Sequence, residues 1–186
     1  MSTIYASAGD SYVSNTALSA SGESWATCRG DDSTTGSQHN NSSTSGSFGV
    51  LARASAGRGG ETYIIYRSYF PFDVSGESGT VSAASVYLYL DNTGSTGGYG
   101  ENVRVLRAAA LDASTADFGN IFSSGTTLFG ALDTGPVTIG TTAQYYEFPF
   151  SSDGISALQT SIDSSATMTV AAVSDRYDYA GTTPTT

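Results

Sequence analysis

Tyrosine is the residue of this sequence best suited to hold a ligand, and the chain contains twelve of them. A tyrosine ring offers a flat apolar face, on which a sugar ring can stack, and a hydroxyl group that hydrogen-bonds at its edge. Many of the tyrosines must fill the core instead. We expect five to be exposed as a glycan-binding cluster: Tyr87, Tyr89, Tyr99, Tyr177 and Tyr179.

Aspartates in loops are the second group with ligand chemistry. Calcium takes carboxylate and carbonyl oxygens from such loops. The candidate ligands are Asp10, Asp175 and Asp178, although their spacing does not match that of a dedicated calcium loop. The sequence therefore leaves a structural Ca²⁺ open and predicts no other cofactor.

Residues for catalysis are scarce. The single histidine, His39, and the single cysteine, Cys28, both lie in a polar, low-complexity stretch. A serine or cysteine nucleophile needs a histidine that a third group holds in a shaped pocket. A glycosidase needs two paired carboxylates, and no such pair can be named among the few glutamates of the chain. We therefore predict that the protein is not an enzyme.

The charge balance excludes two classes of partner. Seven arginines and no lysine stand against seventeen acidic residues, so the net charge is −10. Such a chain repels the phosphates of nucleic acids and the headgroups of anionic lipids. No stretch approaches the roughly 18 apolar residues of a membrane-spanning helix, and no signal peptide is visible. We expect neither nucleic acid nor a membrane as a partner.

β-strands must position these side chains, because Tyr, Val, Ile and Phe recur in short runs. Residues 63–72 carry large side chains on both faces, so we expect this strand to be covered on both sides. Pro71 predicts a bulge or a strand end. A Ser- and Gly-rich break at 75–79 leads to an alternating run at 83–90, which we expect to pair with the first strand.

Other segments repeat this pattern. We expect strands at 3–14, 48–54, 102–108, 144–150 and 166–173, and weak ones at 127–132 and 137–139. A helical turn capped by Ser114 or Thr115 and a short helix capped by Ser152 or Asp153 interrupt them. The sequence thus indicates one all-β domain over 1–186, an antiparallel β-sandwich of jelly-roll type with one or two short helical turns.

Two segments lack the residues to bury themselves. Residues 15–47 hold mostly Ser, Thr, Gly, Asn and Asp, so we expect a long polar loop or arm that a neighbour orders, with Trp25 as its anchor. Residues 174–186 form a polar C-terminal tail. Both segments are candidate contacts with other chains.

Several short motifs follow one another along the chain. They are Asp10-Ser11-Tyr12-Val13, Arg67-Ser68-Tyr69-Phe70-Pro71-Phe72-Asp73, the run from Ser82 to Leu90, and Ser174-Asp175-Arg176-Tyr177-Asp178. Their order resembles that of the DNRLRE-type domain, a jelly-roll module similar to carbohydrate-binding modules. The resemblance covers most of residues 60–180.

The resemblance implies structural roles for four residues. Arg67 is expected to pair with Asp73 or a neighbouring carboxylate and so to fix the exit of its strand, while Phe70 and Phe72 fill the sandwich. Members of the family usually continue into a further strand near the point where this chain stops. The sandwich then lacks that strand, receives it from a partner by strand addition, or belongs to a longer chain.

Domains of this type occur in phage virion proteins and in secreted or cell-surface proteins that bind polysaccharides. The leading hypothesis is a virion structural protein, such as a capsid decoration, head-fibre or tail-associated protein, that contacts other virion proteins or copies of itself. The alternative is a non-catalytic carbohydrate-binding module of an extracellular or cell-surface protein. A virion protein that also binds a host-surface glycan combines the two hypotheses.

Overall fold

The longest strand, β4 (Gly60–Asp73), lies at the centre of the fold. The computed structural model describes residues 2–6, 11–18, 23–30, 34–40, 50–57, 60–90, 102–133 and 135–185. Strand β1 (Ser11–Leu18) pairs with one edge of β4, while β3 (Leu51–Gly57) and β11 (Thr167–Ser174) divide the other edge between them. The strand expected at 63–72 therefore carries three neighbours.

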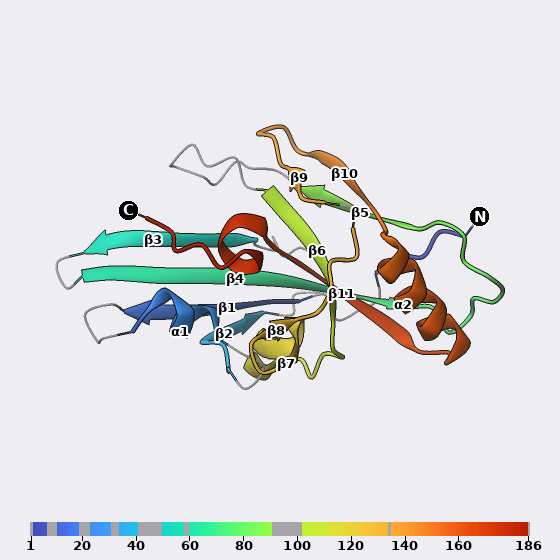
Figure 1. The fold of residues 1–186 in the computed structure, drawn as a ribbon, viewed down its shortest axis with the longest axis horizontal. Coiled ribbons are helices and arrows are strands. Elements are labelled where there is room, and N and C mark those ends of the chain that lie inside the picture. The colour runs from blue at the N-terminus through green and yellow to red at the C-terminus, as the bar shows by residue number, and fades with distance from the viewer. Residues whose placement is uncertain are drawn as a thin grey trace.

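These strands belong to a seven-stranded antiparallel sheet. Its order is β2–β1–β4–β11–β6–β9, with β3 beside β4. The added strands are β2 (Gln38–Asn40), β6 (Asn102–Ala108) and β9 (Val137–Thr138). In Figure 1 the sheet follows the long axis of the molecule, from the β3–β4 hairpin at one end to α2 (Ser152–Asp163) at the other.

A smaller layer is formed by β5 (Ser85–Leu90) and β10 (Gln144–Pro149), which pair only with each other among the described residues. The expected pairing of the 83–90 strand with the 63–72 strand is therefore wrong. The connection after β4 carries β5 across to the second layer, where Val86 and Leu88 face the core. A third, two-stranded sheet joins β7 (Phe122–Ser124) and β8 (Thr127–Leu128).

Both faces of β4 are buried for part of its length, as its sequence predicts. On one face, Tyr63, Ile65 and Tyr69 enter a first core that also contains residues of α1 (Trp25–Arg29), the 3₁₀ helix η2 (Thr115–Ile121) and the π-helix η3 (Asp175–Tyr179). On the other face, Phe70 enters a second core that is covered by β5, β10 and α2. The antiparallel all-β sandwich expected from the sequence is confirmed.

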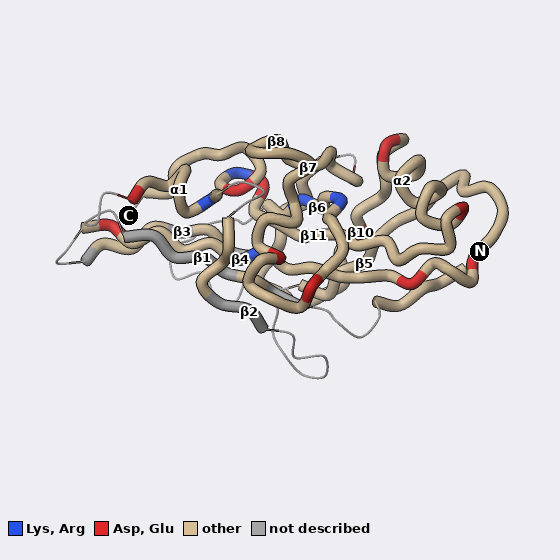
Figure 2. Tube along the Cα trace, turned by 90° about the horizontal axis from the view of Figure 1, so that it is seen from below, with Lys and Arg blue, Asp and Glu red and all other residues tan. Residues whose placement is uncertain are grey.

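Figure 2 views the same chain from below. It shows α1 and the β7–β8 hairpin on one side of β1, β3 and β4. In this view the blue basic segments lie in the middle of the molecule, whereas red acidic segments extend towards both ends. No helix in the described ranges is both long and apolar enough to span a bilayer.

Three local expectations can be compared with the structure. Ser114 caps η2, as predicted, but α2 is capped by Ser151, one residue before the first of the two predicted caps. Pro71 marks neither a bulge nor a strand end, because β4 continues past it with Pro71 opposite Thr169.

The expected polar arm and tail are packed on their own chain where the structure describes them. β1 extends to Leu18, β2 pairs with β1, and α1 buries Trp25 and Cys28. Trp25 is buried, as expected of the predicted anchor, and its ring centroid lies 5.8 Å from that of Tyr63. The tail forms η3 and is not an open polar segment there.

The first turn of α2 packs closely on the chain behind it. A Cβ atom at Gly154 would lie 2.6 Å from the carbonyl oxygen of Leu132 and 3.1 Å from the Phe150 side chain. Gly154→Ala should therefore lower the free energy of unfolding by about 1–3 kcal/mol, although alanine is the better helix former. Denaturant unfolding measures this change.

Gly76→Ala is the matched control, because nothing lies within 4 Å of a Cβ atom at that position. It should change the free energy of unfolding by less than about 0.5 kcal/mol. Equal stability of Gly154→Ala and the wild type would contradict the close packing of α2.

Candidate functional site

Three of the four exposed large hydrophobic side chains in the described residues lie on one surface, the outer side of the β5–β10 sheet. They are Tyr87, Tyr89 and Tyr145, with 57%, 62% and 70% of their surface exposed. Tyr89 is opposite Tyr145, and Tyr87 is opposite Glu147. Opposite residues in an antiparallel pair share a face. We call Ser85, Tyr87, Tyr89, Tyr145 and Glu147 the tyrosine face.

Period-two alternation produces this surface. Between the outward residues, Val86, Leu88 and Phe148 point into the second core. Phe148 is fully buried, and the hydroxyl of half-buried Tyr146 accepts a hydrogen bond from the backbone N–H of Gly140 at 2.7 Å. The tyrosine face therefore stands on a layer whose reverse side is fixed by packing.

Two of the tyrosines meet as a pair. The ring centroids of Tyr89 and Tyr145 are 5.1 Å apart, and the ring planes are inclined by 67°. This edge-to-face geometry is favourable for aromatic pairs. The two rings together form a corner, and each ring limits the motion of the other. Most of the surface of both side chains stays in contact with water.

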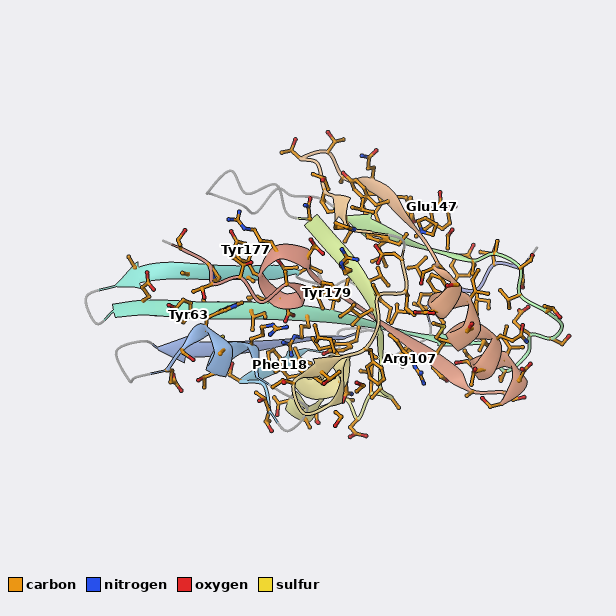
Figure 3. The ribbon with its side chains drawn as sticks, viewed as in Figure 1. Tyr63, Arg107, Phe118, Glu147, Tyr177 and Tyr179 are labelled. Carbon is orange, nitrogen blue, oxygen red and sulfur yellow. The ribbon has the colours of Figure 1, made fainter. Side chains whose placement is uncertain are left out.

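Glu147 supplies the charged group of the tyrosine face. The Ser85 hydroxyl donates to its Oε1 atom at 2.7 Å, and the Tyr87 hydroxyl also donates to the carboxylate. These two hydrogen bonds lower the pKa of Glu147, and the bond to Glu147 raises the pKa of Tyr87. An ionised carboxylate is thus held in place beside the aromatic rings. Figure 3 labels Glu147 on β10.

The predicted tyrosine cluster is assembled only in part. Tyr87 and Tyr89 lie together, and Tyr99 lies outside the described residues. Tyr177 is buried in the first core, and half-buried Tyr179 lies under Arg104, so their predicted exposure is wrong. Figure 3 shows both on the η3 coil, well separated from Glu147. Tyr145 was not predicted, because the sequence does not reveal which strand pairs with residues 83–90.

A second cluster of charges is buried on the opposite face of the large sheet. Arg67, with 0% exposure, donates from Nε and Nη2 to the two carboxylate oxygens of Asp178 at 2.7 and 2.8 Å. Its remaining donors reach the carbonyl oxygens of Phe118 and Arg29, at 2.6 and 2.7 Å. Burial lowers the pKa of Arg67, but the charge and hydrogen bonds of Asp178, together with the nearby Tyr69 and Cys28, outweigh burial and raise it.

The partner of Arg67 is therefore Asp178 and not Asp73. Asp73 is exposed and accepts a hydrogen bond from the backbone N–H of Ser75 at 3.0 Å. Phe70 and Phe72 lie in the second core, the first buried and the second half-buried. The Phe118 ring stacks on the Arg67 guanidinium, with its centroid 3.8 Å from Cζ.

The two calcium candidates that the structure describes, Asp175 and Asp178, are each paired with an arginine. Asp178 is paired with Arg67, Asp175 accepts from Nε of Arg104 at 2.5 Å, and Asp10 lies outside the described residues. Within the described ranges, no group of three or more acidic, histidine or cysteine side chains could hold a metal ion. A calcium site stays a prediction.

Asp133 is a buried carboxylate whose charge is only weakly stabilised by its surroundings. Neither of its carboxylate oxygens has a hydrogen-bond partner of good geometry among the described residues, and burial raises its pKa more than the nearby backbone N–H groups of Asp133 and Gly135 lower it. Its ion pair with Arg104 is long, at 3.9 Å, and Arg104 is already held by Asp175. Burial raises the pKa of Asp133, so the charged form is a local source of instability.

The chain was compared with known proteins, and it matches no protein-family model and no curated sequence. The resemblance to DNRLRE-type domains therefore stays a prediction that rests on the motifs of the chain itself.

The Arg67 cluster yields a stability prediction. Arg67→Lys keeps the charge but cannot form the two parallel bonds to Asp178, so the free energy of unfolding should fall by about 1.5–3 kcal/mol. Arg107→Lys is the control, because Arg107 is exposed and its side-chain contact among the described residues is with the Phe129 ring, at 5.3 Å. Denaturant midpoints within error of each other for both variants would show that the cluster does not hold the fold.

Asp133 yields a prediction about pH. A carboxyl group whose pKa is raised in the folded state adds stability at low pH and loses it as pH rises through that pKa. Asp133→Asn should therefore raise the free energy of unfolding near neutral pH, by up to about 1 kcal/mol. The gain should vanish below the ordinary pKa of aspartate, about 3.9. Thermal unfolding across pH measures this, and a gain that is constant with pH would exclude the charge as its cause.

Proposed function

We propose that this protein is a non-catalytic binding module of a virion surface, and that it attaches to its target through the tyrosine face. The observation that carries the proposal is the clustering of Tyr87, Tyr89 and Tyr145 in solvent on one rigid sheet. Exposed aromatic side chains that gather on one surface are typical of binding sites. Strands also hold such side chains more firmly than loops do.

Binding without catalysis is favoured by the charges. The Arg67–Asp178 and Arg104–Asp175 ion pairs both connect η3 to the large sheet and therefore have a structural role. Glu147 is the carboxylate of the tyrosine face, and its pKa is lowered by its hydrogen bonds. A general acid that works near neutral pH needs a raised pKa instead. Glu147 is therefore suited to accept hydrogen bonds from a ligand.

The virion location rests on the resemblance to DNRLRE-type domains. In a particle, the module would contact other virion proteins or copies of itself through surfaces other than the tyrosine face. The same binding chemistry would serve a secreted or cell-surface protein, which is the alternative location.

Binding of the labelled full chain to a panel of intact bacterial cells tests the role of the tyrosine face. A Tyr89→Ser, Tyr145→Ser double variant should bind at least about tenfold more weakly than the wild type, since aromatic residues dominate binding energy at such surfaces. Tyr5→Ser is the control, because Tyr5 is 83% exposed in the N-terminal segment, outside the tyrosine face.

Equal loss of cell binding in both variants, or in neither, would contradict the role of the tyrosine face. The location has a separate readout: antibodies against the chain should label intact virus particles from the same source. Particles that remain unlabelled and lack the chain by mass spectrometry would favour the extracellular alternative.

A further inference from the structure

We infer that the ligand of the tyrosine face is a neutral glycan, whose sugar ring stacks in the Tyr89–Tyr145 corner while its hydroxyl groups donate to Glu147. This inference rests on the proposed function and names the ligand class of that site. It follows from three properties of the face: its ring geometry, its fixed acceptor and its lack of positive charge.

The ring geometry suits a saturated ring. The rings of Tyr89 and Tyr145 are inclined by 67° and their side chains are mostly exposed. A sugar ring has apolar C–H faces and polar edges, so one face can lie on an aromatic ring while the edge reaches polar groups beside it. The corner offers such a ring face with a second ring beside it.

The acceptor lies at a matching distance. The Tyr87–Glu147 pair is two residues along the strands from the Tyr89–Tyr145 pair, a separation of about 7 Å. A sugar ring with its hydroxyl substituents spans such a distance. Glu147 is exposed, and its carboxylate can accept about four hydrogen bonds. Ser85 and Tyr87 orient it and leave acceptor sites free for ligand hydroxyl groups.

The charge of the face selects against acidic sugars. Neither β5 nor β10 contains an arginine, the chain has no lysine, and its net charge is −10. A sialylated, sulfated or uronic-acid glycan would bring a carboxylate or sulfate next to Glu147 with no cation on these strands to pair with it. Neutral sugars avoid this repulsion and still use the acceptor.

A cationic ligand is the main competitor, because tyrosines and a carboxylate also recognise ammonium groups. Such recognition works best when several ring faces converge on a desolvated cation. Here the rings lie on the open surface of a two-stranded sheet, and the one described pair is edge-to-face. This open arrangement favours a ligand that lies across the surface.

An array of neutral, sialylated and sulfated glycans, probed with the labelled full chain, tests the inference. We expect binding to neutral glycans only. Tyr145→Ser should weaken it about tenfold, Glu147→Gln should weaken it several-fold, and Tyr5→Ser should leave it unchanged. Thermal unfolding of each variant confirms that the fold is retained.

Three results would overturn the inference. They are an array without neutral hits, preferred binding to acidic glycans, and competition by trimethylammonium ligands but not by neutral sugars. Periodate oxidation of the cells separates this inference from the proposed function. Cell binding that needs Tyr89 and Tyr145 but survives periodate would keep the binding role and exclude the glycan, whereas binding that ignores these tyrosines would remove both.

Discussion

The burial of a guanidinium group in the middle of β4 is the constraint on which the rest of the structure depends. Arg67 lies on a central strand, away from water, so its donors must all be satisfied within the protein. Four hydrogen bonds to Asp178, Phe118 and Arg29 satisfy four of its five N–H groups. These acceptors lie on η3, η2 and α1, which are far apart in the sequence. One side chain therefore specifies where three connecting segments pack.

Because of this constraint, the two faces of the large sheet have different roles. The first face carries the internal ion pairs. Between the sheet and the segments that cover it lie Arg67 with Asp178 and Arg104 with Asp175. The second face is covered by a simple apolar layer, β5 and β10. Within the part of the chain that the structure describes, this layer alone presents a cluster of aromatic rings to water.

Much of the fold could be predicted from the sequence, because strand positions follow from local alternation. The runs at 63–72, 83–90, 102–108, 144–150 and 166–173 all coincide with strands. Contacts across long separations could not be predicted. Asp178 is 111 residues from Arg67, and nothing local distinguishes it from Asp73. The pairing of β5 with β10, which places Tyr145 beside Tyr89, is of the same kind. Tyr177 was misjudged because a polar tail gave no sign that it would fold back over a buried arginine.

The alternation within β5 and β10 has an evolutionary consequence. Val86, Leu88 and Phe148 hold the layer in place, and the outward residues between them make no contribution to that core. The identity of the outward residues is therefore free to drift while the fold is conserved. In the proposed binding role, this separation would allow a change of target at the cost only of cross-strand contacts such as the Tyr89–Tyr145 pair.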